Sequence, residues 1–198
     1  MNDIKKTFCA FESGETFTAF DTETTGLNPE NARVIEIGAI QFNKYGVITT
    51  YETLINPKTP IPWQITKINN ITDQMVANKA TFVEIAPEFL AFIKNTKLIA
   101  HNANFDIHFI NAELDRAKIQ KLCSPAIPAV DTVKLAQKSF PQLKCHKLQY
   151  LAETFNIDRG NAHRATDDAR VCMNVFFKCL QAFKKAHPEL VEIQPSLF

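Results

Sequence analysis

The first part of the chain carries three runs of apolar residues that predict strands. Apolar and polar residues alternate through Thr16–Thr22, and Arg33–Asn43 is strongly apolar. A Lys44-Tyr45-Gly46 turn then leads into a third run at Val47–Ile55. Tight turns between such runs are typical of hairpins, so we expect an antiparallel meander.

From Trp63 onward the spacing becomes helical, with short strands expected at Leu98–Ala100 and Ala129–Asp131. Helices are expected at Thr72–Ala77, Phe82–Lys94, Asn104–Lys118, Thr132–Phe140, Lys147–Phe155 and about Arg164–His187. This order predicts an α/β fold in which one mixed five-stranded sheet is flanked by helices. We expect residues 1–187 to form a single domain and residues 188–198 to form a C-terminal tail.

Composition narrows the class of protein. The 198 residues are 45% hydrophobic and 22% charged, which is typical of a soluble globular domain. No apolar run is long enough to span a bilayer, and no secretory segment is found at the amino terminus, so we expect a cytoplasmic protein without membrane contact. Five cysteines without a CxxC pair argue against disulfides and thiolate zinc sites. A net charge of +1 means that any affinity for nucleic-acid phosphates must be local.

Two carboxylates stand at the end of the first predicted strand. Asp21 and Glu23 share the face of the strand that carries Phe17 and Ala19, because the side-chain period is two. Adjacent carboxylates repel each other, and hard divalent cations such as Mg²⁺ relieve that repulsion. The alternative at this point is an exposed acidic turn closed by Gly26.

A third carboxylate lies on the apolar stripe of the last predicted helix. Asp168 follows Ala165 by three residues and precedes Cys172 by four, whereas Asp167 lies about 100° away around the helix axis. An acid on an apolar face needs a partner or a metal. The alternative is an acid that complements the helix dipole.

A fourth acid and a histidine occupy comparable places. Asp106 heads the apolar stripe of Ile110 and Leu114, where a helix cap is the alternative. His163 lies in a loop five residues before Asp168 and could act as a general base, where a surface histidine is the alternative.

The chain resembles the DEDDh 3′→5′ exonucleases of the RNase H-like fold, and among them the proofreading epsilon subunits of bacterial DNA polymerase III. The motifs that carry the resemblance are Phe20–Leu27, Val34–Ala39, His101–Asp106 and His163–Ala169. It covers about residues 16–185. It implies a metal-dependent 3′→5′ exodeoxyribonuclease that hydrolyses the terminal phosphodiester with two Mg²⁺ or Mn²⁺ ions.

The resemblance also implies residue roles. Asp21, Glu23 and Asp168 would hold one metal, Asp21 and Asp106 would lie near the second, and His163 would be the base. Thr24, Leu27, Asn102 and Phe105 would contact the terminal nucleotide. The family often has His-Gly-Ile-Thr where this chain has Asn69-Asn70-Ile71-Thr72, so the contact made by that loop is an open question.

The chain ends in Gln194-Pro195-Ser196-Leu197-Phe198, which is similar to the peptide that binds bacterial sliding clamps, except that proline replaces the usual leucine. Gln194, Leu197 and Phe198 would be its anchors, and a disordered tail is the alternative.

Three functions are compatible with the motifs. The first is trimming of single-stranded or frayed DNA 3′ ends in proofreading or repair, with a DNA polymerase as a possible partner. The second is an RNA 3′ exonuclease of the RNase T or oligoribonuclease kind, since the acids contact only phosphate and metal. The third is a non-catalytic polymerase-associated subunit, which a complete set of acids disfavours.

Overall fold

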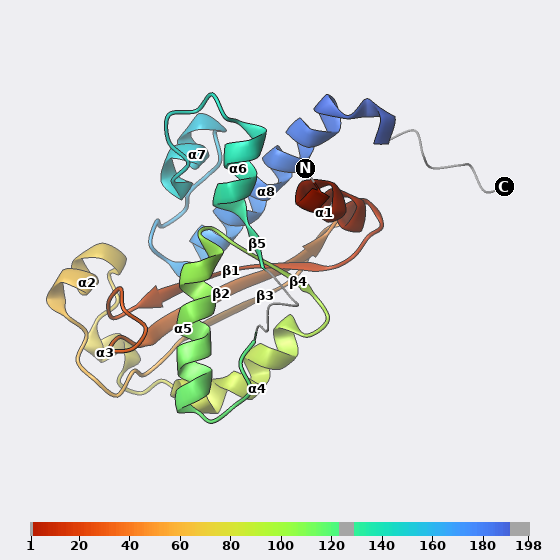
Figure 1. Ribbon diagram of the computed structural model, residues 1–198. Helices are drawn as coiled ribbons and strands as arrows, with labels where there is room; N and C mark the ends of the chain where they lie inside the picture. Colours follow the sequence, from red (N-terminus) through yellow and green to blue (C-terminus); the bar gives the residue numbers. More distant parts are fainter. Residues whose placement is uncertain (1, 123–128, 191–198) are drawn as a thin grey trace.

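The computed structural model describes residues 2–122 and 129–190, and it contains one mixed sheet with helices on both faces (Figure 1). The five strands lie in the order β3-β2-β1-β4-β5, with β1 antiparallel to β2, β2 antiparallel to β3, and β4 parallel to both β1 and β5. Their bounds are β1 Phe17–Thr24, β2 Val34–Asn43, β3 Gly46–Leu54, β4 Lys97–Ala100 and β5 Val130–Asp131.

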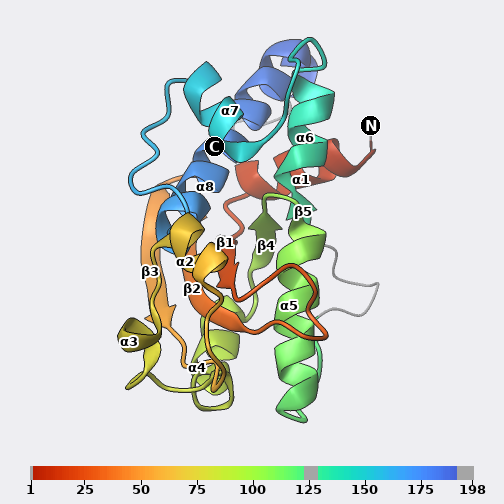
Figure 2. The same ribbon diagram turned by 90° about the vertical axis from the view of Figure 1, so that its left-hand side faces the viewer.

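The helices form a layer on each face of the sheet (Figures 1 and 2). One layer contains α1 Asn2–Glu12, α6 Thr132–Ser139, α7 Leu148–Thr154 and the long α8 Ala165–Ala186. The opposite layer contains α4 Phe82–Ile93 and α5 Ala103–Arg116. The short α2 Trp63–Asn69 and α3 Asp73–Val76 lie in the connection between β3 and α4, and a 3-10 turn at Pro188–Leu190 follows α8.

Each face of β1 buries a separate set of aromatic rings. Phe17 points toward α8, and its ring centroid lies 5.4 Å from that of Phe176 on that helix. The Phe17 ring also lies 6.0 Å from the ring of Phe42 on the neighbouring strand β2. Phe20 points the other way, into the core that β1 forms with α4 and α5. The face that carries Phe17 therefore belongs to α8, and this choice fixes where the acids at the end of β1 point.

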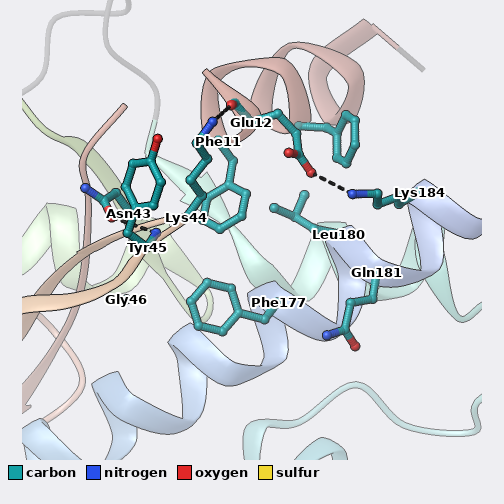
Figure 3. A pocket seen from close by; sticks show the side chains of 11 residues that line it. Phe11, Glu12, Asn43, Lys44, Tyr45, Gly46, Phe177, Leu180, Gln181 and Lys184 are labelled. Carbon is teal, nitrogen blue, oxygen red and sulfur yellow. Dashed lines mark hydrogen bonds and ion pairs between the residues drawn. The ribbon is translucent and has the colours of Figure 1, made fainter. Parts of the chain in front are cut away.

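The expected fold is confirmed, and every predicted strand and helix appears with its ends within two residues of the prediction. Helix α1 was not predicted. Its Phe8 packs on Phe183 of α8, with ring centroids 5.3 Å apart. A groove of about 380 Å³ lies between α1, the β2–β3 turn and α8. Figure 3 shows side chains that line it, among them Glu12 and Lys184, which form an ion pair.

The described residues bear on the membrane prediction but not on the prediction for the C-terminal tail. No helix within the described residues is long and apolar enough to cross a membrane. The division into a domain of residues 1–187 and a tail stays a prediction. The clamp anchors Gln194, Leu197 and Phe198 lie outside the described residues.

Candidate functional site

Two acids lie at the carboxyl end of β1, on the face that α8 covers. Asp21 pairs with Gly38 of β2, and Glu23 pairs with Glu36. A Cβ atom added to Gly38 would lie 2.1 Å from the backbone nitrogen of Thr166, so only glycine lets α8 begin directly on β2. This close approach places the first turn of α8 over Asp21.

A buried ion pair holds the start of α8. Glu36 is 1% exposed and accepts hydrogen bonds from Arg164 Nε at 3.0 Å, Arg164 Nη2 at 2.6 Å and the backbone N–H of Ala165 at 2.9 Å. Such bidentate, charge-assisted contacts fix geometry as well as contributing energy. Asp168, four residues after Arg164, is thereby directed toward the end of β1.

Asp106 reaches the same place from α5. Its Oδ1 accepts hydrogen bonds from the backbone N–H of Thr22 at 2.9 Å and from the Thr22 hydroxyl at 2.7 Å. Residues of β1 pair with β4 only as far as Ala19, so the Thr22 N–H is free to donate to Asp106. Burial raises the pKa of Asp106 to about 7, although the bonds from Thr22 act in the opposite direction.

Glu23 is supported by the α2–α3 connection. The side-chain amide of Asn69 donates to Glu23 Oε2 at 3.2 Å, and its oxygen accepts from the backbone N–H of Ile71 at 3.0 Å. Asn69 is 1% exposed. Burial raises the pKa of Glu23 to about 8, although the Asn69 hydrogen bond lowers it. The loop that departs from the family pattern therefore contacts a site acid.

Asp168 joins α7, α8 and the loop that carries His163. Its Oδ1 accepts from Gln149 Nε2 at 3.0 Å, and its Oδ2 accepts from the backbone N–H of His163 at 3.1 Å. Burial raises the pKa of Asp168, and the contact with His163 opposes that rise. Glu23, His163 and Asp168 each offer a ligand atom, and these atoms lie within 4.8 Å of one another.

The other three site acids all act on the carboxyl group of Asp21. Burial raises its pKa well above the usual value, and the charges of Asp106, Asp168 and Glu23 raise it further. Four carboxylates that resist ionising together form a site that favours bound cations. The structure thus brings together Asp21, Glu23, Asp106, Asp168 and His163, all expected from the sequence. In contrast to the metal-ligand set that the resemblance implied, His163 lies within the compact group of ligand atoms.

The four residues expected to contact a nucleotide differ in how far they are exposed. Leu27 is 84% exposed in the loop after β1, whereas Thr24 is buried and its hydroxyl donates to the carbonyl of Gly26 at 2.6 Å. Asn102 is exposed at the start of α5, and Phe105 packs on Phe109 with ring centroids 4.8 Å apart.

Sequence reasoning gave no role to Glu36, Arg164, Gln149 or Thr22, and it left Asn69 open. Only Glu36 carried a usable signal, because an isolated acid inside the apolar run Val34–Ala39 must find a buried partner. Partners such as Asn69 and Gln149 are common polar residues, and only the folded chain places them beside the acids.

Known proteins resemble both the sequence and the fold. The profile of a family described as exonuclease, of the RNase T type, matches residues 18–176. The chain is 53% identical over 162 residues to the DNA polymerase III subunit epsilon of Treponema pallidum, covering 81% of this chain and 74% of that protein. It is 38% identical over 170 residues to the PolC-type DNA polymerase III of Caldanaerobacter subterraneus, covering 85% of this chain and 12% of that protein.

A solved structure has the same fold. The nuclease domain of 3′hExo, described as a DEDDh family member bound to rAMP, superposes with a TM-score of 0.74 at 18% identity, covering 85% of this chain and 92% of that domain.

Proposed function

Because the chain belongs to the exonuclease family and is a 3′→5′ exonuclease, we propose that it removes nucleotides from DNA 3′ ends in proofreading or repair. The observation that carries the proposed chemistry is the convergence of four acids from β1, α5 and α8 with His163 at one end of the sheet. The choice of DNA is supported by the treponemal relative, a subunit of a DNA polymerase.

The residues divide the reaction between them. A water molecule attacks the phosphorus of the last phosphodiester, the bond from phosphorus to the 3′-oxygen breaks, and a nucleoside 5′-monophosphate is released. His163, exposed and held beside Asp168, takes the proton of the attacking water, and the 3′-oxygen of the shortened strand takes up a proton. Leu27 packs against the terminal base, and Asn102 and Phe105 line the nucleotide pocket.

The site fits divalent cations, on which this family of exonucleases depends. Glu23, His163 and Asp168 offer oxygen and nitrogen ligands within 4.8 Å of one another, and the half-buried Asp21 and the buried Asp106 add carboxylates whose pKa values are raised. We propose two Mg²⁺ or Mn²⁺ ions, held by Asp21, Glu23, Asp106 and Asp168. When bound, such ions lower the pKa of the attacking water and offset charge on the scissile phosphate.

RNA trimming is the second candidate. The solved 3′hExo domain, which has the same fold, is described as bound to rAMP. The fold therefore does not decide between a DNA and an RNA substrate. The hypothesis of a non-catalytic subunit that only binds a polymerase is disfavoured. In such a protein the four carboxylates would repel one another and lower the stability of the fold without contributing to catalysis. A polymerase and a sliding clamp are proposed partners, the clamp through Gln194, Leu197 and Phe198, and a cytoplasmic location stays a prediction.

A substrate panel tests this function. We expect purified protein with Mg²⁺ to shorten 5′-labelled single-stranded DNA and mismatched primer ends at least tenfold faster than matched ends or RNA of the same sequence. Asp21→Asn serves as the inactive background, and Asp167→Asn, an acid paired with Arg170 on the next turn, is the matched control that retains activity. Equal inertness of the wild type and Asp21→Asn would refute the enzyme, and faster RNA trimming would favour the second candidate.

Asn69 offers a separate test of the support around Glu23. Asn69→Ala removes the 3.2 Å hydrogen bond to Glu23, and residues that orient a metal ligand typically contribute roughly 10- to 100-fold in metal affinity or activity. We expect the Mg²⁺ concentration for half-maximal rate to rise by about tenfold. The exposed Asn70→Ala is the control. An unchanged Mg²⁺ dependence in Asn69→Ala would contradict the assigned support.

A further inference from the structure

A basic groove lies next to the catalytic acids, between the start of α5 and the connection from α6 to α7. It has a volume of about 590 Å³, and its lining includes Asn102 on one side and Lys144, His146 and Lys147 on the other. Figures 1 and 2 both show α6 and α7 beside each other, next to the end at which α5 begins.

Its charge contrasts with that of the neighbouring acids. Lys144 and Lys147 are exposed, and within the described residues neither ammonium group has an acidic partner. His101 forms part of the floor, where its Nδ1 lies 2.9 Å from the Thr132 hydroxyl. Burial lowers the pKa of His101 to about 4, so His101 adds no positive charge to the groove at neutral pH.

Two residues of the groove lining lie close along the chain to groups of the catalytic site. Asn102 lies four residues before Asp106, and its backbone N–H donates to Asp131 Oδ1 at 3.2 Å, which fixes the start of α5. Leu148, another lining residue, precedes Gln149, whose amide donates to Asp168. These two links bring the groove lining to within about one helical turn of Asp106 and one residue of a side chain that is bound to Asp168.

We propose that this groove binds the phosphodiester backbone of the nucleotides on the 5′ side of the scissile linkage, with Lys144 and Lys147 as its phosphate contacts. The inference rests on the proposed function and adds the path of the strand. With a net charge of +1, the protein has little excess positive charge overall, so affinity for the strand must come from lysines at local positions along its path. The two Cα atoms are at most about 11 Å apart, which suits neighbouring phosphates of one strand.

A comparison of two substrates tests the groove. An oligonucleotide reaches the groove, whereas the p-nitrophenyl ester of thymidine 5′-monophosphate has a reactive phosphodiester but no further phosphate. For Lys144→Gln/Lys147→Gln we expect KM for single-stranded DNA to rise about tenfold and the slope of log(kcat/KM) against log salt to fall by about 1.4. Hydrolysis of the small ester should change less than twofold.

Lys94→Gln/Lys185→Gln removes the same charge from two other exposed positions and should leave both substrates unaffected. The proposal is overturned if the groove variant keeps the wild-type KM and salt slope on DNA, or if it loses both substrates equally. Binding of fluorescent single-stranded DNA to Asp21→Asn protein separates this proposal from the proposed function. If adding Lys144→Gln/Lys147→Gln to the Asp21→Asn protein abolishes this binding, the proposal is supported even if the wild type hydrolyses neither substrate. Unchanged binding overturns the proposal.

Discussion

Replacing Arg164 by methionine is expected to lower the free energy of unfolding by about 3 kcal/mol, because it leaves the carboxylate of Glu36 buried without its cation. The Glu36 side chain is 1% exposed, and that of Arg164 is 32% exposed, which places the effect at the lower end of the range for buried pairs. The start of α8 then loses its anchor on β2. Because Asp168 lies on the first turn, turnover should fall by roughly a hundredfold, the cost of a displacement of about 1 Å.

Two further variants show whether the loss of stability comes from the unpaired, buried carboxylate of Glu36 or from the lost packing of the Arg164 side chain. Arg159→Met breaks the ion pair with Glu153, in which both partners are exposed, and should change stability by less than about 0.5 kcal/mol. Glu36→Gln/Arg164→Met removes the buried charge but keeps an oxygen for the Ala165 N–H, so it should recover about half of the loss. Urea unfolding measures all three. If Arg164→Met is as stable as Arg159→Met, or if the double variant is no better than the single, Glu36 and Arg164 do not act as described.

The sequence predicts the direction of a side chain more readily than its partner. Strand and helix periods are local properties, so spacing alone gives the place of Asp21 on the face of β1 that carries Phe17, and the burial of Asp168 rather than Asp167 on α8. The partners come from distant parts of the chain: Glu36 and Arg164 are 128 residues apart, and Glu23 and Asn69 are 46 residues apart. No local pattern encodes those pairings.

Helix α1 illustrates the same limit. Its aromatic residues gain burial by packing on other elements, as Phe8 does on Phe183 of α8 and Phe11 does on Phe176 of α8 and Phe17 of β1. A short amphipathic helix is stabilised mainly by such tertiary contacts, so its own propensity gives a weak signal. The sheet, in contrast, follows from three adjacent runs whose hairpin partners are neighbours along the chain.

Replacing Asp106 by asparagine should raise the stability of the metal-free protein and lower its exonuclease activity. Asn keeps an oxygen that can accept the hydrogen bonds from Thr22 but removes a carboxylate whose pKa is about 7 in the folded state and about 4 in the unfolded chain. Without metal at pH 8.5 we expect the variant to be about 3 kcal/mol more stable than the wild type. Exonuclease activity should fall by about a thousandfold, since several kcal/mol of charge stabilisation depend on the acid set.

The pH dependence follows from the sign of these shifts. A carboxyl whose pKa is raised by folding stabilises the folded state while it is protonated, and that contribution is lost as the pH rises through the folded value. Asp106 at about 7 and Glu23 at about 8 place the whole loss between about pH 4 and pH 8, and we expect about 2 kcal/mol of it to fall between pH 6.5 and 8.5 in the metal-free wild type. His101, whose pKa is lowered to about 4, acts in the opposite direction only below about pH 6.5.

Urea unfolding in EDTA and in MgCl₂ at three pH values tests the linkage. Mg²⁺ should restore stability to the wild type most strongly at pH 8.5, and much less to Asp106→Asn, because bound cations relieve the repulsion that raises these pKa values. Asp115→Asn removes a charge from the same helix at a side chain that is 70% exposed, so it should change neither the pH slope nor the Mg²⁺ response. A metal-free wild type whose stability is constant or rises over this range would contradict the electrostatic account, because four acids that repel one another in the folded state must cost more as they ionise.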